Sequence, residues 1–256
     1  MPEIVGSRLT LLLSNASHRL RLRKRFRARV CHDVEERVTL ANSYGERFLA
    51  AKPSRVADIR DLEYAAALLY AAKSLDRESL RVADFGGGDG TRAAQVLQML
   101  ASTVNVEFQI IEQAGLIEQV RKQQRELLNV DLAICDVEEF KQMDSIGSPY
   151  HVVAFVGSAT YVHLRTALEV ADLSGAPYIW LQRYIISGSE TLLLRDSWVA
   201  NGAEYQEWVP NLATFGLFTS EWEVVWWVTG ERLVGSKSRA IGSTHAVNVL
   251  LRRRED

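Results

Sequence analysis

The residues best suited to chemistry in this chain lie in residues 81–90, which read RVADFGGGDG. A short apolar run ends at Asp84, a glycine-dense turn follows, and residues 91–101 are good helix formers. This pattern predicts a strand, a tight loop and the start of a helix. Such a loop brings backbone N–H groups close to a ligand, and the helix dipole favours an anionic group there. The segment therefore predicts a binding loop for a ligand with an anionic group.

The spacing of the glycines separates two cofactor classes. A dinucleotide fingerprint requires Gly-x-Gly-x-x-Gly, and counted from Gly86 its third glycine falls on Thr91. A nicotinamide cofactor is therefore disfavoured. The chain instead has an Asp-x-Gly-x-Gly-x-Gly pattern, formed by Asp84, Gly86, Gly88 and Gly90. This pattern is similar to the first motif of the class I methyltransferases that use S-adenosylmethionine (SAM). A tight turn without a ligand is the alternative, and the acidic residue before the first glycine favours binding.

Composition restricts the partners of the chain only broadly. The chain has 256 residues, 47% of them hydrophobic, and a net charge of −2, so its overall charge gives no attraction to nucleic acid. Cys31 and Cys135 lack the spacing of a disulfide or a metal site, and no metal is expected. No apolar run approaches the roughly 18 residues needed to cross a bilayer. We therefore expect a soluble cytoplasmic protein.

Short β-rich runs and helical stretches alternate through the middle of the chain. The expected strands are residues 80–85, 106–112, 130–135, 151–156 and 178–184, and the expected helices are 91–102, 114–128 and 163–173. This alternation predicts an α/β fold with a Rossmann-like, doubly wound and mostly parallel sheet. Two C-terminal runs, 221–228 and 245–252, fit antiparallel strands added to that sheet. Residues 1–75 have helical character and predict an N-terminal extension to a domain that spans 76–256.

Residues at the carboxyl ends of the strands are candidate site residues, because ligands bind there in such sheets. Glu112 ends the second strand, 22 residues after Gly90, and a carboxylate at this spacing can accept hydrogen bonds from both hydroxyls of a ribose. A solvated glutamate is the alternative. Asp136 follows the third strand, where it could also cap the next helix. Gly157 and Ser158 end the fourth strand.

Over about residues 78–185, the chain resembles a class I SAM-dependent methyltransferase. The resemblance implies that Asp84 pairs with the ammonium of the methionine moiety and that the amides of residues 86–90 face its carboxylate. It implies that Glu112 holds the ribose. The other implied contacts are those of Asp136 with the adenine, and of Gly157 and Ser158 beneath the cofactor.

A second resemblance is to a family of SAM-dependent methyltransferases with an Asp-Phe-Gly-Gly-Gly-x-Gly loop. Several members are associated with bacterial surface-polysaccharide gene clusters. The similar segments are 42–45, 84–90, 111–113, 158–161 and 177–184. No Asp-Pro-Pro-Tyr type motif follows the fourth strand, which disfavours methylation of an adenine or glutamine nitrogen. The resemblance implies a cofactor more than a substrate.

The candidate catalytic residues follow the fourth and fifth strands. A hydroxyl acceptor gains from a general base within hydrogen-bond reach. His163 is the candidate base, with Tyr161 and Arg183 as orienting groups. A solvent-facing position at a helix start is the alternative for His163. Residues 198–227 contain five of the six tryptophans and overlap residues 186–220, a candidate acceptor-site insertion. This aromatic segment predicts the lining of an acceptor pocket. Core packing or a dimer contact is the alternative.

The basic arm is the segment from Arg19 to Arg29, in which arginine occupies every odd position and Lys24 adds a seventh positive charge. Both a helix and a strand are compatible with its pattern. The arm is a candidate site for an anionic ligand or an anionic membrane surface, and a solvated helix face is the alternative. It lacks interleaved aromatic residues for base stacking, which makes nucleic acid an unlikely partner.

Two functions from different classes follow from these residues. The first is a SAM-dependent methyltransferase that acts on a small-molecule or saccharide acceptor, with oxygen as the expected methyl acceptor. The second is a non-catalytic protein that retains the methyltransferase fold as a scaffold or binding partner. The sequence leaves the oligomeric state open.

Overall fold

The computed structural model describes residues 27–30, 59–118, 120–122, 132–144, 149–159, 164–188, 190–198, 203–232 and 244–254. The described elements, in chain order, are β1 (Arg27–Val30), α3 (Ile59–Ser74), β2 (Ser79–Phe85), α4 (Thr91–Leu100), β3 (Asn105–Glu112), η1 (Ala114–Leu116), β4 (Ala133–Asp136), α6 (Val137–Asp144), β5 (Val152–Val156), α7 (Leu164–Leu173), β6 (Tyr178–Ser187), β7 (Leu192–Trp198), β8 (Ala203–Val209), α8 (Leu212–Phe218), β9 (Trp222–Arg232) and β10 (Thr244–Arg253).

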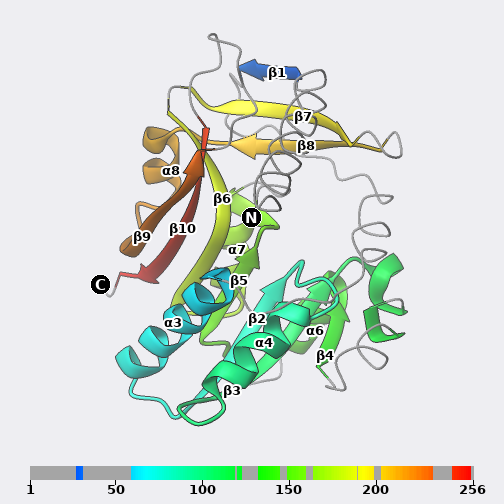
Figure 1. Cartoon of the computed structure of the whole chain (residues 1–256), viewed down its shortest axis with the longest axis vertical. Helices are drawn as coiled ribbons and strands as arrows, with labels where there is room; N and C mark the ends of the chain where they lie inside the picture. The colour runs from blue at the N-terminus through cyan, green and yellow to red at the C-terminus, as the bar shows by residue number, and fades with distance from the viewer. Residues whose placement is uncertain are drawn as a thin grey trace, which may run out of the picture.

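The main sheet has seven strands in the order β4-β3-β2-β5-β6-β10-β9 (Figure 1). The pairs from β4 to β6 are all parallel, whereas β10 runs antiparallel to both β6 and β9. The predicted Rossmann-like sheet with C-terminal antiparallel strands is therefore confirmed. The expected helices that begin at residues 91 and 163 correspond to α4 and α7.

Helices cover both faces of this sheet and bury two hydrophobic clusters. In Figure 1, α3 and α4 lie in front of the sheet, where Tyr64 and Val96 pack with Leu80 and Trp180. On the other face, α6, α7 and α8 pack against alternate residues of the same strands. Strand β5 is apolar throughout, and residues 82–85 of β2 are all buried, because both faces of these central strands are covered.

The order of the strands changes direction at the middle of the sheet, between β2 and β5. From β2 the chain proceeds outward to β3 and β4, and then crosses to the other side of β2 to form β5 and β6. In open α/β sheets, ligands bind at such a switch point, outside the carboxyl ends of the strands. The ends of β2, β3 and β5 are therefore the places to look for a site.

The aromatic C-terminal segment contributes mainly to the core. Trp208, Phe215 and Trp222 are buried on the α7 and α8 side of the sheet. Trp226 packs against Trp180 at 5.8 Å between ring centroids, and Trp227 packs against Phe215 at 5.6 Å, on the opposite face. Adjacent strand residues point to opposite faces, as expected. For these side chains, core packing is the observed role.

A second, three-stranded antiparallel sheet has the order β1-β7-β8. It lies beyond the carboxyl end of β6 in Figure 1, and Ser187 at that end forms a bridge with Asn211. Strand β1 comprises the last two arginine positions of the basic arm and pairs with β7. This part of the arm is thus a strand, while its residues before Arg27 lie outside the described residues. Within the described chain, no helix has the length and apolarity required to span a bilayer.

Candidate cofactor site

The predicted glycine loop connects β2 to α4 in a conformation that requires glycine. Gly86, Gly88 and Gly90 have φ angles of +68°, +61° and +77°, in the left-handed region that residues with a Cβ rarely adopt. Gly86 N–H donates to the Ile111 carbonyl at 2.8 Å, so the loop turns back over β3. Gly90 occupies the N-cap of α4. The loop thus presents its backbone at the N-terminus of α4.

A substitution at Gly86 tests how tightly this loop is packed. A Cβ at Gly86 would lie 2.6 Å from Ser158 Cβ, in addition to the left-handed φ. We expect Gly86→Ala to lower the free energy of unfolding by about 3 kcal/mol, from backbone strain and overpacking together. Urea unfolding measures this change. The matched control is Gly115→Ala, because a Cβ at Gly115 would meet nothing within 4 Å. Equal stability of the two variants would contradict the packing described.

Asp84 lies directly beneath the loop and is 1% exposed. Its Oδ1 is buried and has no hydrogen-bond partner among the described residues. Burial raises the pKa of this carboxyl to about 7, with the positive charge of Arg92 opposing the shift and Glu112 adding to it. A buried oxygen without a donor is unfavourable unless a ligand or water supplies one. Asp84 is therefore suited to receive a cationic donor.

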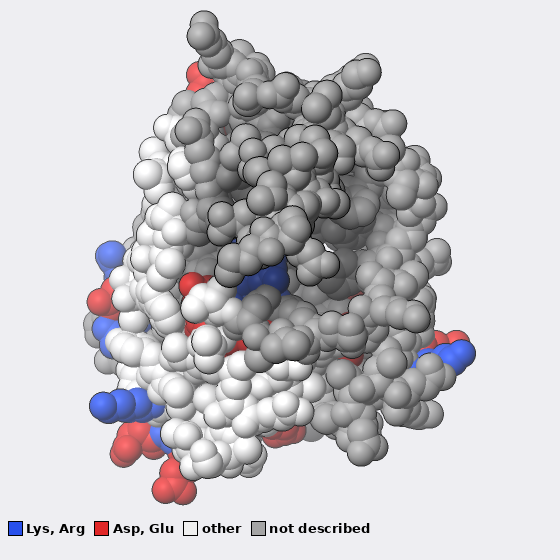
Figure 2. Space-filling view, viewed as in Figure 1, with Lys and Arg blue, Asp and Glu red and all other residues white. Residues whose placement is uncertain are grey.

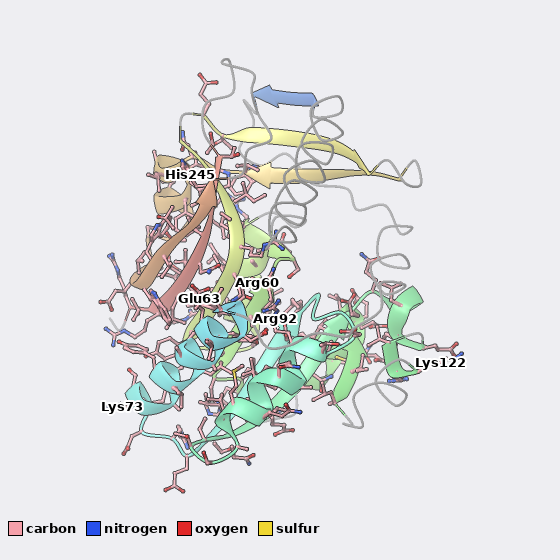
Figure 3. The ribbon with its side chains drawn as sticks, viewed as in Figure 1. Arg60, Glu63, Lys73, Arg92, Lys122 and His245 are labelled. Carbon is pink, nitrogen blue, oxygen red and sulfur yellow. The ribbon has the colours of Figure 1, made fainter. Side chains whose placement is uncertain are left out.

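A buried ion pair joins α3 to α4 beside Asp84. Arg92 Nη1 lies 2.6 Å from Asp61 Oδ1, and Asp61 is fully buried. In Figure 3, Arg92 lies at the start of α4, close to Arg60 and Glu63 near the start of α3. Tyr64 of α3 is also buried here, and its pKa is raised by burial and by the charge of Asp84. The sequence analysis missed these α3 and α4 residues, since no motif surrounds them.

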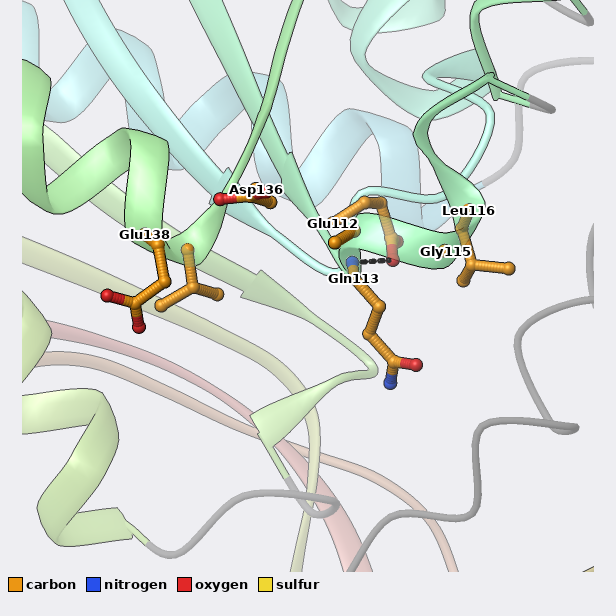
Figure 4. Close-up of a pocket in the computed structure, with 8 residues that line it drawn as sticks. Glu112, Gln113, Gly115, Leu116, Asp136 and Glu138 are labelled. Atoms are coloured by element: carbon orange, nitrogen blue, oxygen red, sulfur yellow. Dashed lines mark hydrogen bonds between the residues drawn. The ribbon is translucent and has the colours of Figure 1, made fainter.

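Glu112 links the glycine loop to a neighbouring pocket. Its Oε1 accepts a hydrogen bond from Gly88 N at 2.9 Å, and its Oε2 accepts one from Gln113 N at 3.2 Å. Burial raises its pKa, and these two hydrogen bonds oppose the shift. The pocket has a volume of about 510 Å³ (Figure 4). Its lining comes from the ends of β3 and β4, and comprises Glu112, Gln113, Ala114, Gly115, Leu116, Asp136, Val137 and Glu138.

Asp136 faces the same pocket from the next strand, because it is the register partner of Glu112. Its Oδ1 accepts a hydrogen bond from Glu139 N at 2.8 Å, and Glu139 Oε2 accepts one from Asp136 N at 3.2 Å. These reciprocal bonds form a capping box at the start of α6. One carboxylate oxygen of Asp136, Oδ1, therefore caps the helix, which was one of the two roles considered for this residue. Figure 4 shows Asp136 and Glu112 on either side of the pocket.

The end of β5 packs against the glycine loop. Ser158 Oγ donates to the carbonyl of Phe85, and Gly157 has a φ of +77°. Arg183 is exposed on β6, the neighbouring strand. Tyr161 and His163 lie outside the described residues. The structure therefore brings Asp84, the glycines, Glu112, Asp136 and Ser158 to one edge of the sheet.

Chemically, this edge offers several kinds of contact. Asp84 offers a buried carboxylate to a cation, and the loop amides at the α4 N-terminus favour an anion. The Glu112 carboxylate can accept hydrogen bonds from hydroxyl groups. The described His, Cys, Asp and Glu residues include no group of three or more that could hold a metal ion. The arrangement suits a zwitterionic ligand that also carries hydroxyl groups.

The chain resembles known proteins in its fold and not in its sequence. No family model matches the chain, and no curated protein matches its sequence. Among solved structures, coclaurine N-methyltransferase bound to N-methylheliamine and SAH is similar, with a TM-score of 0.52 and 12% identity over 99% of this chain and 90% of that one. A SAM-dependent methyltransferase from Geobacter sulfurreducens, in complex with S-adenosyl-L-homocysteine, has a TM-score of 0.49 and 16% identity over 84% and 100%. The chain thus has a Rossmann-like methyltransferase fold.

Proposed function

We propose that this chain is a SAM-dependent methyltransferase that acts on a small-molecule or saccharide acceptor, at oxygen. The observation that carries this proposal is the buried Asp84 carboxylate, whose Oδ1 has no donor among the described residues and lies at the glycine loop. An ammonium next to a carboxylate is the α-amino acid arrangement of the methionine moiety. Residues that fit such a group therefore stand together at the switch point of the sheet.

Each part of the cofactor has a suited residue in this proposal. Asp84 binds the ammonium, and the amides of the Gly86, Gly88 and Gly90 loop bind the carboxylate. Glu112 accepts hydrogen bonds from the ribose. The second carboxylate oxygen of Asp136 accepts one from the adenine amino group in the pocket of Figure 4. When bound, the cofactor supplies an electrophilic methyl group to an acceptor held in line with it.

The acceptor side of the site is assigned to the second sheet and the end of β6. The small sheet, whose strands β7 and β8 fall within the candidate insertion 186–220, lies on the side to which the carboxyl ends of the strands point (Figure 1). His163 is the proposed general base, with Tyr161 and Arg183 as orienting groups. Residues 76–256 form the SAM-binding domain and residues 1–75 its extension. We place the enzyme in the cytoplasm, with the basic arm as a candidate anion-binding segment.

Calorimetric titration with SAM and S-adenosylhomocysteine (SAH) tests the proposal. We expect micromolar binding by the native protein and a loss of at least 100-fold in Asp84→Ala and Gly88→Val, since one lacks the carboxylate and the other is strained at φ +61°. Gly216→Ala is the control, because Gly216 lies in α8, outside the pocket, and a Cβ there would meet nothing within 4 Å. Undiminished affinity in both site variants would refute the assignment. A well-folded native protein that binds neither compound would instead favour the scaffold function.

A further inference from the structure

Strand β6 contains a β-bulge at the carboxyl edge of the main sheet. In the pairing with β10, Leu181 faces Val249 and Tyr184 faces Val247, so two residues of β6 stand opposite Asn248 alone. The second of these two residues is Arg183, whose φ of +56° lies in the left-handed region. Bulges next to functional sites re-aim a side chain, and backbone outliers persist where the surrounding structure holds them.

Residues of two other elements hold this bulge in place. Arg183 N donates to Asn248 Oδ1 at 2.7 Å, which replaces the ladder bond lost in the bulge. Asn248 Nδ2 in turn donates to Glu63 Oε2 of α3 at 2.5 Å. Asn248 is 7% exposed, so its amide is fixed by burial as well as by hydrogen bonds. The conformation of Arg183 is therefore built by β10 and α3 together.

The bulge lies next to the candidate cofactor site. Gln182 pairs with Val156, the last residue of β5, and its carbonyl accepts from Gly157 N at 2.8 Å. Ser158, which follows Gly157 in the chain, packs on the glycine loop at Gly86. Figure 2 shows basic and acidic atoms beside one another near the centre of this face, where α3 begins in Figure 1. The side chain of Arg183 is exposed at this edge of the sheet.

The bulge also contains a buried polar atom without a hydrogen-bond partner among the described residues, on the side chain of Gln182. Gln182 is fully buried, and its Nε2 donates to the Arg60 carbonyl at 2.7 Å. Its Oε1 is buried without a hydrogen-bond partner among the described residues. A buried carbonyl oxygen of this kind is satisfied when a ligand or water donates to it. Two successive residues of the bulge thus have polar groups for which the described residues show no partner. These groups are the Gln182 side-chain oxygen and the exposed Arg183 guanidinium.

We propose that the methyl acceptor carries an oxyanion, a carboxylate or a phosphate, and that Arg183 binds it at the β6 bulge. A guanidinium matches the planar geometry of either group and binds it through paired N–H donors. The side chain of Arg183 is exposed at the carboxyl edge of the sheet, on the side from which the acceptor must approach. This inference rests on the proposed function, since it names the acceptor class of the same site.

Titration with sodium phosphate and with sodium acetate, at low ionic strength and followed by calorimetry, tests this inference with and without SAH. We expect saturable millimolar binding of at least one anion by the native protein. Arg183→Gln, which removes the charge, and Asn248→Ala, which keeps the charge but removes the support of the bulge, should each weaken it at least tenfold. Arg183→Lys should retain part of the affinity.

The control is Arg77→Gln, an exposed arginine in the turn before β2, at the opposite edge of the sheet. It should bind the anion as the native protein does. Stronger binding of phosphate or of acetate decides between the two acceptor groups. Absence of saturable binding, unchanged binding in Arg183→Gln, or an equal loss in Arg77→Gln would overturn the inference. SAH affinity, measured in the same samples, reports on the proposed cofactor separately, so the two failures are distinguishable.

Discussion

Replacing Asp84 with asparagine is expected to stabilise the protein at pH 8 while abolishing cofactor binding. Burial raises the pKa of Asp84 from 3.8 to about 7, which means that ionisation of this carboxyl opposes folding. The asparagine side chain has nearly the same shape as the carboxylate and no charge to desolvate. We expect Asp84→Asn to raise the free energy of unfolding at pH 8 by about 4 kcal/mol, the equivalent of the shift in pKa.

The pH dependence of this gain has a defined sign. Below pH 3.8 the carboxyl is protonated in the folded and unfolded states alike, and the native protein suffers no penalty. As the pH rises from 3.8 to about 7, the unfolded state loses its proton first, so native stability falls across this window. Above that window the difference is constant. The advantage of Asp84→Asn should therefore disappear towards pH 4.

Urea unfolding of both proteins between pH 4 and pH 8 measures this effect, with SAH titration on the same samples. Asp76→Asn is the control, because Asp76 is an exposed acid in the turn after α3. It should change neither the pH dependence of stability nor SAH binding. A destabilised Asp84→Asn protein at pH 8 would show that the carboxylate has a structural role. Retained SAH affinity would show that Asp84 is not the ammonium site.

The sequence predicted those parts of the fold that are encoded locally. The alternation of strands and helices specified the sheet, and the Asp-x-Gly-x-Gly-x-Gly spacing specified the loop, because the three left-handed φ angles of that loop all fall on its glycines. Glu112 was found by its spacing from that loop, and the structure joins the two through Gly88 N. Its role toward a ribose stays a prediction, as do the roles of Tyr161 and His163.

Features that depend on distant partners could not be predicted in this way. The Arg92 to Asp61 pair spans 31 positions, and the hydrogen bond from Arg183 to Asn248 spans 65. Neither pair has a motif, since each depends on how α3 and β10 pack against the sheet. Strands β7 and β8 were also not predicted as strands, because their runs lack a regular period, whereas a strand at β1 was one of the two conformations that the pattern of the basic arm left open. The Asp136 cap was one of two roles that the sequence left open.

Arg92 links the stability of the fold to the charge of the cofactor site, which leads to a second large effect. Arg92→Gln removes the 2.6 Å ion-pair partner of the fully buried Asp61, and removing one member of a buried ion pair is strongly unfavourable. We expect a loss of about 3 kcal/mol in the free energy of unfolding, which urea unfolding measures. The double variant Arg92→Gln with Asp61→Asn should recover most of the lost free energy of unfolding, since the buried charge that Arg92 balanced is then also removed.

The same substitution should shift the pH dependence of SAH binding. Asp84 must be ionised to bind an ammonium, so affinity should rise with pH up to and through the pKa of about 7. The positive charge of Arg92 lowers that pKa, whereas the charge of Glu112 raises it. Without Arg92, the midpoint of the binding curve should move to higher pH, because Asp84 then ionises less readily.

The variants separate this charge effect from the loss of stability. Asp61→Asn with Arg92→Gln should be stable and still bind SAH with the raised midpoint, whereas Arg92→Lys should keep the midpoint close to that of the native protein. The ammonium of SAH titrates identically in every sample, so a difference between proteins belongs to the site. An unshifted midpoint in the stable double variant would mean that Arg92 acts only as the partner of Asp61. A raised midpoint would establish that this α4 arginine sets the charge of the carboxylate on which cofactor binding depends.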